Sequence, residues 1–134
     1  MHVQPYINFD GRCEEALAFY GRVLGAEVSS LMRFKDAPDQ GMIPPGSANR
    51  VMHATFRVGD TEMLAMDGRG EGKTNFQGIS LALTASNAAE VERVFAGLSD
   101  GGKVEMPLGK TFFSPMFGMV RDKFGITWML LARA

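Results

Sequence analysis

One order of secondary-structure elements occurs twice along this chain, and it constrains the fold more than any other feature. Alternating β-formers at 3–9 predict a strand, apolar residues at helical spacing predict a helix over 13–24, and three further strands follow. After a glycine-rich segment at 68–78, the same order recurs. The predicted strands are 3–9, 27–34, 51–58, 61–67, 79–84, 103–106, 111–121 and 126–132, and the predicted helices are 13–24 and 88–98.

Such a unit builds a four-stranded sheet with one helix on one face, and the other face needs a partner. We therefore expect an α+β fold in which two βαβββ modules pair their sheets edge to edge into a curved cup. The concave surface of that cup is the natural place for a ligand. The expected organisation is a single domain over 1–134, with module one at about 1–68 and module two at about 77–134.

Charge and composition limit the partners. The 134 residues carry 14 Lys and Arg against 15 Asp and Glu, without a basic block, which argues against nucleic acid. No apolar run approaches the roughly 18 residues of a membrane span, and the first residues lack the order of a signal peptide. The single cysteine, Cys13, and the ten methionines favour a reducing compartment, so we expect a cytoplasmic protein that contacts no membrane.

Two stretches of the chain carry a family resemblance. The opening stretch comprises 6–17 (YINFDGRCEEAL), Phe19-Tyr20 and Leu24-Gly25. The closing stretch comprises Met106-Pro107-Leu108, Phe112-Phe113, Phe117-Gly118 and 122–129 (DKFGITWM). The opening stretch resembles the vicinal oxygen chelate superfamily of glyoxalase-like proteins, and the closing stretch resembles the PhnB-like branch of that superfamily.

The resemblance covers nearly the whole chain and implies a glyoxalase-like fold, a U-shaped cup and usually a homodimer. It does not imply one reaction, because the superfamily includes metal-dependent isomerases, dioxygenases and epimerases, antibiotic-inactivating transferases and metal-free proteins that bind a drug. PhnB-like members have been labelled demethylubiquinone methyltransferases.

The metal ligands of the superfamily are His and Glu on paired strands, a donor set that suits zinc, nickel, iron or manganese. Here the aligned positions are Gln4, 64–66, Ser80 and Met129, none of which is His, Asp or Glu. A shift of the alignment brings in only Glu62 or Asp67. We therefore expect no metal site and no cofactor.

His53 is the one histidine inside a predicted element, and Thr55 and Arg57 share its strand face. If this face lines the cup, His53 could bind a ligand or act as a base. Otherwise it is a partly buried or solvent-facing residue without a functional role, which is the more common situation for a histidine on a strand. Acidic residues at the start of the first helix, Glu14 and Glu15, are explained by the helix dipole.

The glycines after Asp67 do not indicate a nucleotide-binding loop, because no helix is predicted directly after them. The methyltransferase label therefore has no support in these residues. Cys13 fits the role of a small apolar residue better than that of a nucleophile.

The favoured function is the binding of a small organic ligand in an apolar cup. The residues predicted to contact it are Gln4, Tyr6, Asn8, His53, Phe112 and Trp128. The alternative is an isomerase, dioxygenase or lyase that uses His53, either as an acid–base catalyst or as a metal ligand with Glu62 or Asp67. A third possibility is an interaction module whose role rests on the expected homodimer.

Overall fold

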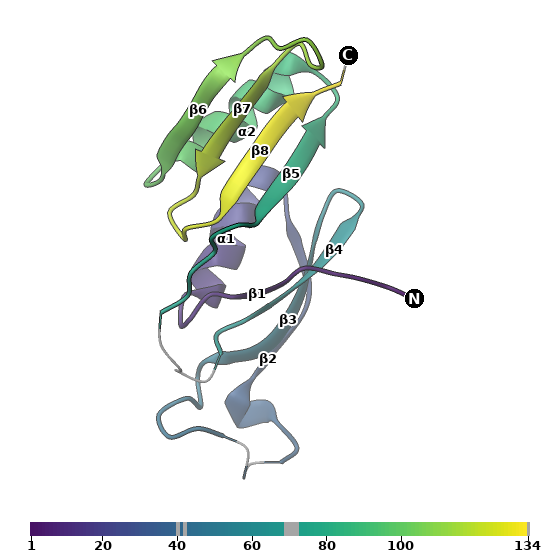
Figure 1. Cartoon of the computed structure of the whole chain (residues 1–134). Helices are drawn as coiled ribbons and strands as arrows, with labels where there is room; N and C mark the ends of the chain where they lie inside the picture. The colour runs from purple at the N-terminus through teal and green to yellow at the C-terminus, as the bar shows by residue number, and fades with distance from the viewer. Residues whose placement is uncertain (40, 42, 69–72, 134) are drawn as a thin grey trace. The chain divides into compact units, whose positions relative to one another are not determined.

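A computed structural model describes residues 1–39, 41, 43–68 and 73–133 of the chain (Figure 1). The chain divides into two compact units, Met1–Thr74 and Asn75–Ala134. Their sheets have the strand orders β1-β4-β3-β2 and β5-β8-β7-β6, and in each sheet the first and last strands of the unit pair in parallel. The predicted α+β fold with two βαβββ modules is thus confirmed. The predicted cup concerns how the two sheets lie relative to one another and stays a prediction.

The N-terminal unit forms its core between one helix and one face of its sheet. Its elements are β1 (Tyr6–Asn8), α1 (Cys13–Leu24), β2 (Glu27–Arg33), the short 3-10 helix η1 (Phe34–Asp36), β3 (Val51–Val58) and β4 (Thr61–Met66). Alternation along β3 buries Ala54 and Phe56, and the ring of Phe56 stacks on Tyr20 of α1 at 6.3 Å between centroids. The helix ends where Gly25 adopts the left-handed conformation and donates its N–H to Tyr20.

The C-terminal unit follows the same plan. Its elements are β5 (Ser80–Ala85), α2 (Ala88–Ser99), β6 (Lys103–Gly109), β7 (Phe117–Arg121) and β8 (Thr127–Ala132). Figure 1 shows α2 behind this sheet, where the apolar face of the helix meets buried Val120 and Leu130. A Cβ at Gly118 would lie 2.8 Å from the Leu108 side chain and 2.9 Å from the Phe95 ring of α2, so a larger residue here would force these side chains to shift.

Strand boundaries depart from the predictions where proline and turn residues occur. β6 extends through Pro107 to Gly109. Proline has no backbone N–H, but an edge strand such as β6 tolerates it, because N–H groups that point away from the sheet pair with no other strand. β7 begins at Phe117 instead of residue 111. The reason is a tight turn in which the Ser114 N–H donates to Thr111 Oγ1 at 3.0 Å and the Ser114 hydroxyl donates to the Ala132 carbonyl at 2.7 Å.

A buried aspartate holds several segments of the N-terminal unit together. Asp67 accepts the N–H groups of Gly11 at 2.9 Å, Cys13 at 2.8 Å and Val51 at 2.8 Å. This carboxylate therefore holds the start of α1, the start of β3 and the end of β4 together. The glycine-rich segment that follows lies partly outside the described residues, and the element after it is β5 rather than a helix.

Candidate ligand-binding face

The sheet face opposite α1 is here named the N-terminal open face. The helix-facing residues Ile7, Ala54 and Ala65 are buried, whereas their neighbours along the strands point the other way. Register places Tyr6 opposite Leu64, and Leu64 opposite Thr55, so these three side chains cross the open face in one row. Tyr6 is 48% exposed.

A hydrogen-bonded chain of three side chains lies on this face. Tyr6 Oη is 3.1 Å from His53 Nδ1, and Thr55 Oγ1 is 3.4 Å from His53 Nε2. The rings of Tyr6 and His53 meet edge to face, with centroids 5.6 Å apart. Burial, with a smaller contribution from Cys13, raises the pKa of Tyr6 above its usual value, so its phenol stays protonated at neutral pH.

This arrangement leaves the direction of the hydrogen bonds open. A neutral imidazole has one N–H, and hydroxyl groups both donate and accept. With the proton on Nε2, His53 accepts from Tyr6; with the proton on Nδ1, it donates to Tyr6 and accepts from Thr55. The chain can therefore present a donor to a ligand from either of its ends.

Apolar side chains surround the imidazole. Met32 on β2 is the register partner of His53, and Leu64 and Met66 on β4 share the open face with it. Met32 is exposed, whereas Leu64 and Met66 are half-buried. A few polar groups set in an apolar surface are the composition typical of a small-molecule site.

Charged residues of this face gather at its far end. Gln4 donates from Nε2 to Glu62 Oε1 at 2.8 Å. Arg57 has Glu62 and Glu27 as register partners on its two sides. Because Arg57 is four residues from His53 on one strand, their Cα atoms are about 13 Å apart.

The structure places the six predicted ligand contacts in different settings. It brings Tyr6 and His53 together, while Gln4 is bonded to Glu62 at the charged end. Asn8 serves a turn, because its Oδ1 accepts the Asp10 N–H at 2.8 Å and its amide packs against Gly68.

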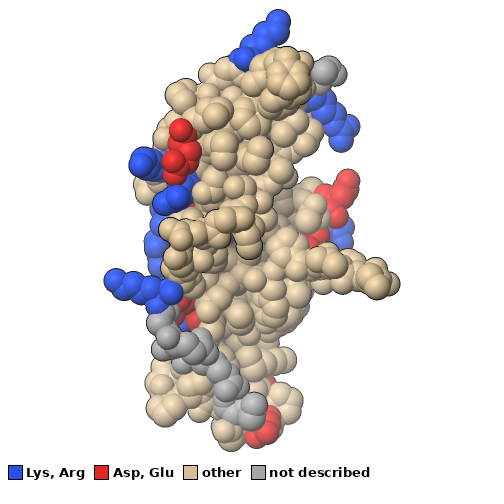
Figure 2. All heavy atoms as spheres, viewed as in Figure 1, with Lys and Arg blue, Asp and Glu red and all other residues tan. Residues whose placement is uncertain are grey.

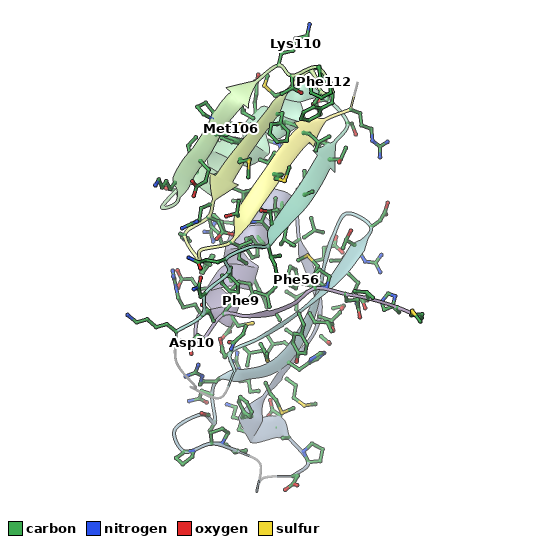
Figure 3. The ribbon with its side chains drawn as sticks, viewed as in Figure 1. Phe9, Asp10, Phe56, Met106, Lys110 and Phe112 are labelled. Atoms are coloured by element: carbon green, nitrogen blue, oxygen red, sulfur yellow. The ribbon has the colours of Figure 1, made fainter. Side chains whose placement is uncertain are left out.

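The other two predicted contacts belong to the C-terminal unit. Phe112 projects fully exposed from the turn before β7 (Figure 3). Trp128 is only 3% exposed and donates from Nε1 to Asp122 Oδ2 at 2.9 Å, so it has a core role on the helix-facing side of β8. The spacing of its neighbours contained this signal, since buried Leu130 and Ala132 follow Trp128 with period two.

The corresponding open face of the C-terminal sheet has a different character. Three methionines are successive register partners across three strands: Met106, Met119 and Met129. Next to them Ala82 of β5 is small and exposed, and Arg121 pairs with Glu105 at 3.3 Å. We did not anticipate this row, although the period-two positions of β7 and β8 could have revealed it.

Metal-ligating residues do not gather in the described part of the chain, where no group of three or more His, Cys, Asp or Glu side chains could hold an ion. The carboxylate of Asp67 accepts hydrogen bonds from three backbone N–H groups. Cys13 is buried, and burial, reinforced by the negative charges of Asp67 and Glu14, raises the pKa of its thiol to about 12. Glu14 forms a two-point ion pair with Arg33, which lowers the pKa of that carboxyl.

Charges elsewhere are dispersed. In the view of Figure 2, basic side chains stand singly or in small groups among uncharged ones over each unit. Among the described residues no helix is both long and apolar enough to cross a membrane.

Comparison with known proteins establishes the family. The sequence profile of the family described as 3-demethylubiquinone-9 3-methyltransferase matches residues 1–131. The chain belongs to this family. Protein YjdN of Escherichia coli K12 is 34% identical over 97% of this chain and 94% of its own length.

Solved structures agree with the fold. Protein PA1353 of Pseudomonas aeruginosa is 35% identical, with a TM-score of 0.88 over 99% of this chain and 98% of its own. A PhnB protein of Bacillus cereus is 31% identical, with a TM-score of 0.82 over 98% and 99%. The fosfomycin resistance protein FosX of Listeria monocytogenes shares the fold alone, at 11% identity and a TM-score of 0.70 over 100% and 94%. The predicted PhnB-like membership and glyoxalase-like fold are confirmed.

Proposed function

We propose that this PhnB-like protein binds a small organic ligand on the N-terminal open face. The polar group of the ligand contacts the Tyr6–His53–Thr55 chain, and its apolar part lies on Met32, Leu64 and Met66. The observation that carries the proposal is a hydrogen-bonded chain left half-exposed in apolar surroundings. A purely structural network gains most when it is fully covered, because water then cannot compete for its hydrogen bonds.

The experiment is a fragment screen followed by methyl NMR of methionine and leucine side chains. We expect shifts in the methyl signals of Met32, Leu64 and Met66. His53→Gln removes the ring and should weaken binding about tenfold, the effect of roughly 1.4 kcal/mol. His2→Gln is the matched control, because His2 is exposed at the chain terminus. Shifts confined to Met119 and Met129 would contradict the proposal and move the site to the other sheet.

The second candidate function is metal-independent acid–base catalysis by His53. Both ring nitrogens lie within hydrogen-bond reach of a hydroxyl, which is the geometry a proton-transferring residue needs. In that case His53→Gln abolishes turnover of a bound ligand, whereas Thr55→Val reduces it partially. A ligand that binds and is recovered unchanged, without solvent deuterium, would exclude this candidate for that ligand.

We also propose that the chain forms a homodimer. On the edge strand β2, Val28 and Leu31 are the register partners of the helix-facing residues Phe56 and Ala54, yet both are exposed. Helix α1 thus leaves an apolar strip uncovered, and a second copy would cover it. Light scattering should give twice the chain mass, and Leu31→Lys should give the monomer. A monomeric wild type would refute the proposal.

A further inference from the structure

We propose, resting on the proposed function, that the ligand is an organic acid whose ionised oxygens bind a protonated His53 between Tyr6 and Thr55. The juxtaposition that points to this is an imidazole with a hydroxyl at each nitrogen, and no carboxylate of the described residues is hydrogen-bonded to either nitrogen.

The first step concerns what charging the imidazole does to its neighbours. An imidazolium donates from both nitrogens and accepts at neither. Tyr6 Oη and Thr55 Oγ1 must then both accept from the ring, and the hydrogens of both hydroxyls turn away from it. Protonation thus converts a chain with one outward donor into a cation flanked by two outward donors.

The second step matches this state to a ligand. A carboxylate or an ionised acidic phenol or enol supplies only acceptors and a negative charge. Such a group accepts a hydrogen bond from one of the two hydroxyls and faces the imidazolium, so a hydrogen bond and a charge attraction form together. A charged partner strengthens this hydrogen bond beyond a neutral one. A neutral amide lacks the charge that would stabilise the imidazolium.

The third step is the charge of the surroundings. Toward β2 the register partner of His53 is the thioether Met32, and Met66 follows Ala65, the β4 partner of Ala54. The charged residues Glu27, Arg57 and Glu62 are paired with one another four residues further along β3, where the Cα of Arg57 is about 13 Å from that of His53. On β1 the facing group is the neutral phenol of Tyr6. Asp67, after the end of β4, directs both carboxylate oxygens at backbone N–H groups. An incoming anion is therefore the natural counter-ion.

The proton balance is simple. Organic acids with ordinary carboxyl groups are already ionised at neutral pH. The proton that His53 carries in the complex comes from solvent wherever the free imidazole is neutral, and no covalent bond forms or breaks. Affinity for the acid falls as pH rises, because the proton must be taken from an increasingly basic solution.

The test compares benzoate with benzamide, which has the same ring without the charge, using ¹⁵N NMR of histidine side chains. We expect benzoate to bind at least tenfold more tightly and His53 to show the imidazolium signal in the benzoate complex. His2, which is exposed, provides an internal comparison in the same spectrum. At least one of Tyr6→Phe and Thr55→Val should weaken benzoate binding several-fold, and His53→Gln should remove the preference for benzoate.

Two results would overturn the inference. If benzamide binds as tightly as benzoate, or if His53 stays neutral in the benzoate complex, the acid class is wrong while the proposed binding face stands. If neither compound binds at millimolar concentration and the fragment screen is also empty, the proposed function fails as well. The folding of each variant is checked by its thermal transition, so a loss of binding is not confused with a loss of structure.

Discussion

The two helices begin in different ways, although their units share one strand order. Helix α2 is capped locally, because Asn87 Oδ1 accepts the N–H of Glu90 at 2.9 Å. Helix α1 has no side-chain cap at Arg12, and its first N–H instead donates to Asp67, 54 residues further along the chain. A free N–H at the helix start is thus satisfied by the preceding residue Asn87 in α2 and by Asp67, at the end of a distant strand, in α1.

This difference shows where stability is shared between elements. A local cap stabilises its own helix and little else. The remote cap also accepts N–H groups from the loop before α1 and from β3, so the loss of one carboxylate would loosen three segments together. We therefore expect the N-terminal unit to be much more sensitive to its single aspartate than the C-terminal unit is to Asn87.

The largest effect is expected for Asp67→Ala. Each buried N–H left without an acceptor costs about 1 to 3 kcal/mol. Two such groups, those of Cys13 and Val51, lose their acceptor, and the more exposed N–H of Gly11 adds less, so unfolding should become easier by roughly 3 kcal/mol. Urea denaturation measures this directly. Asp60→Ala, in the exposed turn between β3 and β4, should stay within about 0.5 kcal/mol. A cost for Asp67→Ala close to that of the control would remove the distinction between the two helix starts.

A smaller effect is expected in the C-terminal unit for Trp128→Phe. The substitution leaves the second oxygen of Asp122 without its indole donor, while Phe124 and Ile126 continue to donate to the first. Because these partners lie within six residues of one another, we expect a cost of about 1 to 3 kcal/mol confined to this turn. Ligand affinity on the N-terminal open face should stay unchanged. A loss of affinity would restore Trp128 as a ligand contact.

Asn87→Ala should cost about 1 kcal/mol, the usual value for a lost N-cap. Hydrogen exchange should show faster exchange only in the first turn of α2, near Glu90. Asn87→Asp, which keeps the accepting oxygen, is the matched control and should leave stability nearly unchanged. A cost for Asn87→Ala above that of Asp67→Ala would reverse the comparison.

The same contrast explains how far the sequence could be interpreted. Both helices and most strands were predictable, because amphipathic spacing and capping residues such as Asn87 and Gly25 are local signals. The role of Asp67 was not predictable, because its partners lie up to 56 residues away, and it was considered only as a fallback metal ligand. Trp128 was predicted to contact the ligand, although the donor site of its indole is occupied by Asp122 only six residues away.

The candidate site was predictable in part for the same reason. Period two placed His53 and Thr55 on one face, but the contact with Tyr6 depends on the parallel pairing of β1 with β4, which brings β1 within reach of β3. The charged partner of Gln4 depends on the same pairing. Strand order, unlike strand existence, is not encoded in any short window of sequence.

The last prediction concerns the reactivity of the Cys13 thiol, which has no effect on stability at neutral pH. Because Cys13 donates its N–H to Asp67, its reactivity reports directly on the remote cap of α1. With its pKa raised to about 12, this thiol should not react with a disulfide reagent at pH 8 in the folded protein. Below about pH 9 the thiol is protonated in both folded and unfolded chains, so it does not alter stability there. As pH rises from about 9 toward 12, the unfolded chain loses this proton first and the folded state loses stability.

Asp67→Asn should make the Cys13 thiol reactive, for two reasons. It removes a negative charge that contributes to the raised pKa, and its amide NH₂ opposes one of the backbone N–H groups, which opens the start of α1 to solvent. Asn87→Ala is the control and should leave Cys13 as unreactive as in the wild type, because the two helix starts belong to different units. Equal reactivity in both variants would mean that α1 opens independently of its distant carboxylate, and the contrast between local and remote capping would lose its energetic meaning.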